Sequence, residues 1–220
     1  MTGSISAVFF DVDDTLVDFD GAARDAFGVV FGPAADYRAW TELSSQWHRR
    51  FPAELSWDDM LVGRTAAFLQ SLGRDDEPAG VEARRMDLIE RSCAVFADVA
   101  GCLQALRAAG LRLGVITNSD PVHQRRKLAS VGLAEAFDVL VISGELGVGK
   151  PSPEIFEHAC RALGVSPSEA LHIGDRLDLD ALAAAGAGLR GVWLDRVGAA
   201  GDEQRVPVVT TLDALPALVA

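Results

Sequence analysis

Two aspartates, Asp11 and Asp13, directly follow an apolar run near the start of the 220-residue chain. In an extended chain alternate side chains point to the same side, so the two carboxylates share one side and Val12 is turned away. Like charges this close repel, and one carboxylate is driven towards its neutral form unless a cation shares the site. The stretch therefore predicts a metal site, a proton-carrying acid, or both.

Three further groups of polar residues each follow a predicted strand. Thr117 and Asn118 follow one strand, Lys150 lies in a glycine-containing loop after the next, and Asp175 follows a third. In open parallel sheets the reacting groups lie beyond the carboxyl ends of the strands. We therefore expect these residues to meet the two N-terminal aspartates at one edge of a sheet.

The elements that must position these residues alternate between strand and helix from Asp98 onward. Alternation of this kind implies parallel strands joined by right-handed helical crossovers, which predicts an α/β fold with a Rossmann-like parallel sheet. The predicted strands after the first are 111–116, 137–142, 169–173, 191–194 and 206–209. The predicted helices are 100–109, 122–131, 153–163, 179–185 and 212–219.

The stretch between the first strand and Asp98 has a different character. It lacks strand-like runs, and Trp40, Leu43 and Trp47 recur at the spacing of one helix face. The pattern predicts an all-helical insertion whose aromatic stripe forms its core. The predicted domains are a Rossmann-like core over 1–18 and 97–220 and a helical insertion over 19–96.

Composition limits the partners. The formal net charge of −12 argues against a nucleic-acid polymer or an anionic membrane, because both need basic patches. A small anionic substrate stays open if a metal or a lysine reverses the sign locally. The N-terminus lacks the features of a secretion signal, and no run of about 18 apolar residues is present. We expect a cytoplasmic protein, as a monomer or a homodimer.

Taken together, the motifs resemble those of the haloacid dehalogenase-like (HAD) superfamily, and the chain looks similar to its phosphatase branch with a C1 helical cap. The matching stretches are FFDVDDTL, VITNS, GVGKPSPEIF and HIGDRLDLD. The resemblance implies a HAD-like core, with residues 19–96 as the cap. It also implies a hydrolase that acts on a small-molecule phosphate ester.

The residue types at the motif positions suit phosphoryl transfer. The Asp11 carboxylate can attack phosphorus and form an aspartyl-phosphate that water later hydrolyses. Asp13 can protonate the leaving oxygen and then activate that water. Thr117 and Asn118 can donate hydrogen bonds to the phosphoryl group, and Lys150 supplies a compact positive charge for it.

A magnesium ion is expected because a phosphate monoester brings further negative charge to a site that already holds carboxylates. The resemblance implies three ligands: the Asp11 side chain, the Asp13 backbone carbonyl and the Asp175 side chain. Asp180 would hold a metal-bound water or orient Lys150. Alternatively, Asp180 has only a structural role, as an acid stabilised by the positive N-terminal end of a helix dipole.

Two sets of residues receive weaker interpretations. His172, within the predicted strand before Asp175, is expected to be a packed strand residue, because Asp13 already fills the role of base. Arg49, Arg50 and Arg64 are candidates for substrate selectivity in the cap, although a solvated helix face is the simpler explanation for each.

The sequence thus predicts a magnesium-dependent phosphomonoesterase that works through an aspartyl-phosphate. The substrate is left open among nucleotides, sugar phosphates and phosphoglycolate. One alternative is a haloacid dehalogenase, a class that lacks an acid at the Asp13 position, and another is a phosphomutase. A non-enzymatic binding protein is disfavoured, because neither the nucleophile nor the acid at position 175 is lost.

Overall fold

The computed structural model describes residues 4–201 and 205–219, and the chain divides into two compact units. One unit holds the chain through Asp18 and again from Val95 onward, and the other is Phe19–Ala94. Among the described residues, no helix is long and apolar enough to cross a membrane.

The chain leaves the first unit and returns to it at one place. Val17 and Val95 form an antiparallel bridge, and the Phe96 N–H donates to the Leu16 carbonyl at 3.1 Å. The two ends of the inserted stretch are therefore fastened to each other by backbone hydrogen bonding inside the first unit.

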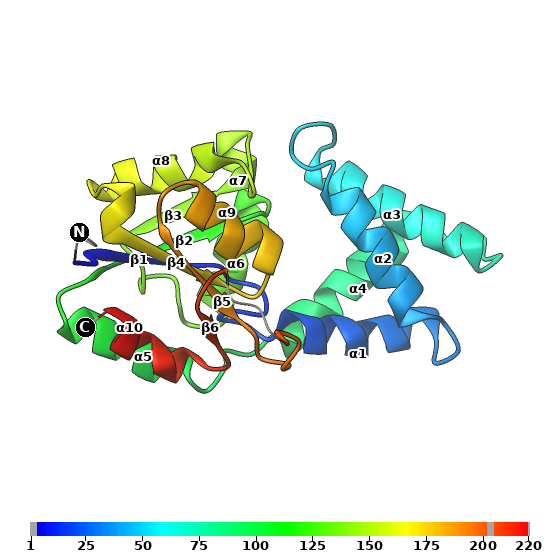
Figure 1. The fold of residues 1–220 in the computed structure, drawn as a ribbon. Coiled ribbons are helices and arrows are strands. Elements are labelled where there is room, and N and C mark those ends of the chain that lie inside the picture. Colours follow the sequence, from blue (N-terminus) through cyan, green and yellow to red (C-terminus); the bar gives the residue numbers. More distant parts are fainter. Residues whose placement is uncertain (1–3, 202–204, 220) are drawn as a thin grey trace. The chain divides into compact units, whose positions relative to one another are not determined.

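A six-stranded sheet lies at the centre of the first unit, in the order β3-β2-β1-β4-β5-β6 (Figure 1). Every neighbouring pair is parallel, which requires a crossover between the strands. The predicted α/β parallel fold is confirmed, and the predicted ends of β2 to β6 differ from the observed ones by one or two residues at most. The strands are β1 Ala7–Phe10, β2 Arg112–Thr117, β3 Val139–Ile142, β4 Ala170–Gly174, β5 Arg190–Leu194 and β6 Val208–Val209.

Helices cover both faces of this sheet. α8 (Pro153–Leu163) and α9 (Ala183–Gly186) lie on one face, and α5 (Val99–Ala108) and α10 (Leu215–Val219) lie on the other (Figure 1). The central strand β1 reads Ala-Val-Phe-Phe and is buried throughout, as expected for a parallel strand covered on both sides. The remaining helices of the unit are α6 Pro121–Ser130 and α7 Ser143–Leu146, with single 3-10 turns at η1 Pro167–Glu169 and η3 Leu212–Ala214.

The segment after β4 departs from the sequence prediction. An ordinary helix was expected over 179–185, but the chain forms a π-helical turn, η2 (Leu177–Leu182), before it continues as α9. Strand β5 passes close beside this turn. A Cβ on Gly191 would lie 1.9 Å from the Ala181 carbonyl oxygen, so only glycine lets the strand and the turn approach this closely.

The second unit consists of four helices, α1 Phe19–Phe31, α2 Tyr37–His48, α3 Trp57–Ser71 and α4 Pro78–Ser92. Its core is a group of aromatic rings in which Trp40 contacts Phe27, Phe31 and Phe68 at centroid distances of 5.9, 5.1 and 5.2 Å. Trp40 therefore belongs to the core of this unit, as its helical spacing predicted.

A buried ion cluster joins α3 to α4. Glu82 accepts hydrogen bonds from Arg64 at 2.8 Å, from Arg85 at 2.8 Å and from the Thr65 hydroxyl at 2.6 Å. Both guanidinium groups also lie near the Trp40 ring, at 4.5 and 5.2 Å. Burial lowers the pKa of Arg64 to about 9, so this cation depends on Glu82 for compensation. Arg64 was a candidate for substrate selectivity, but it is buried and engaged in the core of its own unit.

Glu82→Gln should strongly destabilise the helical unit. The substitution leaves two buried guanidinium groups without a carboxylate, and we expect a loss of about 3–5 kcal/mol in the free energy of unfolding. Urea unfolding followed by tryptophan fluorescence measures this loss, because Trp40, Trp47 and Trp57 all lie in this unit.

Glu42→Gln is the matched control. Glu42 pairs with Arg38 at 3.0 Å on the exposed face of α2, and loss of an exposed pair costs less than about 1 kcal/mol. Equal losses in the two variants would show that burial does not set the contribution of the Glu82 cluster.

Candidate active site

The carboxyl ends of three neighbouring strands bring the predicted residues to one edge of the sheet. Asp11 follows β1 directly, and its N–H still donates to the Ile173 carbonyl of β4 at 2.9 Å. Thr117 is the last residue of β2, and Asp175 comes directly after β4. The sequence expectation that these strand ends share one edge is therefore met by the strand order.

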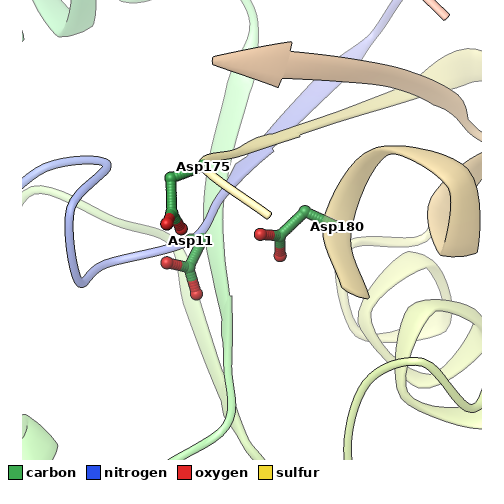
Figure 2. A group of neighbouring side chains, drawn as sticks. All are labelled: Asp11, Asp175 and Asp180. Carbon is green, nitrogen blue, oxygen red and sulfur yellow. The ribbon is translucent and has the colours of Figure 1, made fainter. Parts of the chain in front are cut away.

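Three carboxylates converge at this edge. One oxygen from each of Asp11, Asp175 and Asp180 lies within 4.8 Å of the other two (Figure 2). Asp180 reaches the group from the π-helical turn, and Gly174 makes room for it. A Cβ on Gly174 would lie 2.3 Å from the Asp180 carboxyl carbon, so a larger residue at this position would push the carboxylate away.

Lys150 is the cation of this cluster. Its Nζ donates to Asp11 Oδ1 at 2.6 Å and to Asp180 Oδ1 at 2.5 Å, and its side chain is almost fully buried. Burial disfavours the charged ammonium, but the two carboxylates outweigh that effect and hold the pKa of Lys150 above its usual range. The lysine therefore stays charged and links the nucleophile candidate to Asp180.

One ammonium does not balance three carboxylates. Burial raises the pKa of Asp11 to about 7, with Asp180 adding to the shift, and burial together with Asp11 raises the pKa of Asp175 to about 9. A divalent cation would favour the ionised form of these carboxyl groups. Their oxygens are also the kind of ligand that a hard cation such as magnesium takes. The residues present fit a magnesium ion by both charge and chemistry.

Asp180 is held in its ionised form by two partners. Burial opposes its ionisation, but Lys150 and His172 outweigh burial and hold the pKa of Asp180 well below its usual range. His172 Nε2 lies 3.1 Å from Asp180 Oδ1, and burial keeps the pKa of the imidazole low. A neutral ring with its proton on Nε2 donates to Asp180. His172 is thus buried in β4, as expected, and it also makes a polar contact that was not predicted.

Asn118 fixes the loop that carries Lys150. Its side-chain amide donates to the Lys150 carbonyl at 2.8 Å and accepts from the Lys150 N–H at 2.7 Å. A Cβ on Gly149 would lie 2.6 Å from Asn118 Oδ1, so the glycine permits this pairing. The side-chain amide of Asn118 is therefore oriented by the loop, and one of its two N–H groups is used there.

A tight turn follows Asp13. Asp14 has a left-handed backbone with φ of 59°, and the Val12 carbonyl accepts N–H bonds from each of residues 15–17. An aspartate tolerates this conformation better than most residues other than glycine. The turn fixes the backbone on both sides of Asp13.

The backbone of Asp175 is held from two directions. Its N–H donates to the Thr15 hydroxyl at 3.1 Å, and its carbonyl accepts from the Trp193 indole at 2.8 Å. The Thr15 carbonyl accepts in turn from Arg196, which forms a two-pronged ion pair with Asp98 at 2.8 and 3.0 Å. These contacts join the turn after β1 to β5 and to the residues that follow it.

Asp13 pairs with Lys127, whereas Asp11 pairs with Lys150. Asp13 Oδ1 is 2.5 Å from Nζ of Lys127 on α6, whose side chain is buried. The sequence analysis assigned no role to Lys127 or to Thr15. Thr15 sits within the FFDVDDTL stretch that signals it, whereas Lys127 lies in a charged helix segment that offers no such signal.

Several known proteins resemble this chain in sequence. The model of the haloacid dehalogenase-like hydrolase family matches residues 5–188. The chain is 36% identical to a glyceraldehyde 3-phosphate phosphatase of Methanopyrus kandleri, over 87% of this chain and 84% of that one. It is 34% identical to a phosphoserine phosphatase of Thermus thermophilus, over 76% of this chain and 69% of that one.

Solved structures share the fold. An L-2-haloacid dehalogenase of Xanthobacter autotrophicus superposes with a TM-score of 0.82 over 98% of both chains at 22% identity, which is evidence for the fold alone. The chain belongs to the haloacid dehalogenase-like hydrolase family.

Proposed function

We propose that the protein is a magnesium-dependent phosphomonoesterase that cleaves a small phosphorylated metabolite through an aspartyl-phosphate on Asp11. The observation that carries the proposal is the presence of Asp13 next to a cluster in which Lys150 bridges Asp11 and Asp180. The names of the relatives, phosphatases for glyceraldehyde 3-phosphate and for phosphoserine, support the same reaction class.

Two aspartates divide the chemistry. The Asp11 carboxylate attacks phosphorus while the ester bond to the leaving oxygen breaks, and Asp13 gives that oxygen its proton. Asp13 then takes a proton from the water that attacks the aspartyl-phosphate, which releases inorganic phosphate and restores Asp11. Each proton that leaves Asp13 in the first step is returned in the second.

The phosphoryl group is held by the residues around Asp11. Lys150 places its ammonium 2.6 Å from the Asp11 carboxylate, where it can stabilise charge on the transferring group. Thr117, buried at the end of β2, offers its hydroxyl, and Asn118 offers a backbone contact while its amide fixes the Lys150 loop.

We assign the magnesium site to the side chains of Asp11 and Asp175 and the backbone carbonyl of Asp13, with Asp180 holding a metal-bound water or orienting Lys150. A bound magnesium ion would supply positive charge against the phosphate and the carboxylates. Thr15 and Trp193 fix the Asp175 backbone for this role.

The helical unit, Phe19–Ala94, is proposed to be the C1 cap that the sequence predicts over 19–96, and the first unit is proposed to be the core. A cap of this kind selects the substrate, because the core recognises little beyond the phosphoryl group. We expect a cytoplasmic enzyme, as a monomer or homodimer, whose substrate is a small phosphate ester.

Asp13 also separates the proposal from its alternatives. Displacement of halide from carbon needs no proton donor for a leaving oxygen, so a dehalogenase has no use for an acid at this position. A phosphomutase would use the same two aspartates and would return the phosphoryl group to the substrate instead of to water. No contact in the described residues favours a bisphosphate over a monophosphate.

Asp11→Asn should abolish turnover. An amide is not a nucleophile towards phosphorus, so we expect kcat for an aryl phosphate to fall by more than about a thousandfold. Initial rates with 4-nitrophenyl phosphate and magnesium measure the loss, and chelation of magnesium should stop the wild-type reaction.

Asp178→Asn is the matched control. Asp178 makes the same Asp-to-Asn change on the π-helical turn, but it is exposed and pairs only loosely with Arg176 at 3.5 Å. Its rate should stay within about twofold of wild type, as is usual for exposed sites away from the chemistry. Turnover that survives in Asp11→Asn would contradict the mechanism. Metal-independent release of halide from a 2-haloacid would instead support the dehalogenase alternative.

Magnesium binding should release a proton near neutral pH. Asp175, with a pKa of about 9, and to a smaller extent Asp11, with a pKa of about 7, carry protons in the metal-free protein that ligation must remove. We expect release of about one proton per ion near pH 7.5, falling towards zero above about pH 9.5 where both groups are already ionised. Calorimetry in two buffers of different ionisation enthalpy counts these protons.

Asp175→Asn provides the comparison for this count. Without the Asp175 carboxyl the released protons should fall to the small share that Asp11 contributes at the same pH, and magnesium affinity should drop. Undiminished proton release in this variant would mean that Asp175 is not the group that titrates.

A further inference from the structure

Helix α6 buries two polar side chains where an amphipathic helix would bury apolar ones. Its buried residues are Gln124, Lys127 and Leu128, of which only Leu128 is apolar. Gln124 is fully buried, and neither atom of its amide has a hydrogen-bond partner among the described residues. Lys127 lies on the same face, three residues further on. A face with this composition is selected for something other than packing.

Lys127 forms an ion pair with Asp13. Its Nζ lies 2.5 Å from Asp13 Oδ1, and its side chain is 3% exposed against 31% for the carboxylate. A buried ammonium is stable only when it is paired, so the position of the lysine and the orientation of the carboxylate fix each other. The two residues are 114 positions apart in the sequence, so only the folded core brings them together.

The two lysines of the site form ion pairs with different carboxylates. Lys150 contacts Asp11 and Asp180, whereas Lys127 contacts Asp13. Within the described part of the chain, the group of converging carboxylates holds Asp11, Asp175 and Asp180 and does not include Asp13. The Asp13 carboxylate thus has a cation of its own.

Orientation is what Asp13 needs from a partner. Its backbone is already fixed, because Asp13 bridges Val17 and the next residue, Asp14, begins the tight turn. Only the side-chain torsions of Asp13 are left to set, and a proton donor must hold its oxygen within hydrogen-bond reach of the leaving oxygen.

We propose that Lys127 is a positioning residue for the proposed reaction, which orients the Asp13 carboxyl and stabilises the carboxylate that remains after its proton has gone to the leaving oxygen. The inference rests on the proposed function. Lys127 is not a catalytic residue in this proposal, because it acts on the substrate only through Asp13.

Lys127→Met tests the proposal with two substrates. The leaving group of 4-nitrophenyl phosphate departs readily without a proton, whereas that of an alkyl phosphate such as glycerol phosphate requires one. We expect kcat/KM for the alkyl ester to fall by about tenfold to a hundredfold and that for the aryl ester by less than about threefold, since general acid catalysis matters most for poor leaving groups. Lys127→Arg should recover part of the alkyl activity.

Two further variants separate positioning from stability. Arg125→Met removes an exposed ion pair with Glu145 from the same helix, and both substrates should keep their wild-type rates. In the Asp13→Asn background, the added Lys127→Met change should have no further effect on kcat/KM for the alkyl ester, because the group through which Lys127 acts has been replaced.

The outcomes separate this inference from the proposed function. An equal loss on both esters, or an additive loss in the double variant, overturns the positioning role while the phosphatase assignment stands. A wild-type protein that cleaves neither ester with magnesium overturns the proposed function, and the inference with it. If Lys127→Met does not fold, as judged by its thermal unfolding, the ratio of the two rates in Lys127→Gln decides in the same way.

Discussion

The mutual repulsion of carboxylates at the edge of the sheet is the constraint on which the rest of the structure depends. Asp11, Asp175 and Asp180 bring oxygens within 4.8 Å of one another in a site largely shielded from water. Such a group persists only if cations offset it and if the backbone cannot relax away. Lys150 supplies part of the positive charge. The raised pKa values of Asp11 and Asp175 indicate that these carboxyl groups need a further cation to stay ionised.

Close packing of the backbone keeps these charges together. Gly174 and Gly191 let the π-helical turn press against β4 and β5, which carries Asp180 up to the other acids. π-helical turns are often found at functional sites, and here the turn has a direct geometric task. The backbone N–H of Asp175 donates to the Thr15 hydroxyl, and its carbonyl accepts from the Trp193 indole. Segments from both ends of the chain thus meet around one residue, so the site and the sheet must form together.

The sequence predicted the sheet and most of the site for identifiable reasons. Apolar runs alternating with helical periods indicate parallel strands, and polar residues at the ends of those runs must then share an edge. The helix predicted over 179–185 begins instead as the π-helical turn at 177–182, because the composition of this stretch is that of ordinary helix and the wider turn depends on the neighbouring glycines. Lys127 was not predicted, and Arg64 was predicted either to select the substrate or to lie on a solvated helix face, because long cations are rarely buried unless a distant carboxylate pairs with them. In both cases the partner lies in another element, where no local pattern can reveal it.

The fastening of the inserted stretch has an evolutionary consequence. Because Val17 pairs with Val95 and Phe96 with Leu16, the core closes on itself at the point where the helical unit begins and ends. The register of β1, and with it the position of Asp11, is set by backbone bonds to β2 and β4. Insertions at this junction can lengthen, shrink or be exchanged without disturbing the reacting groups. Under the proposed function, changes in the helical unit alter selectivity while the reacting groups keep their positions.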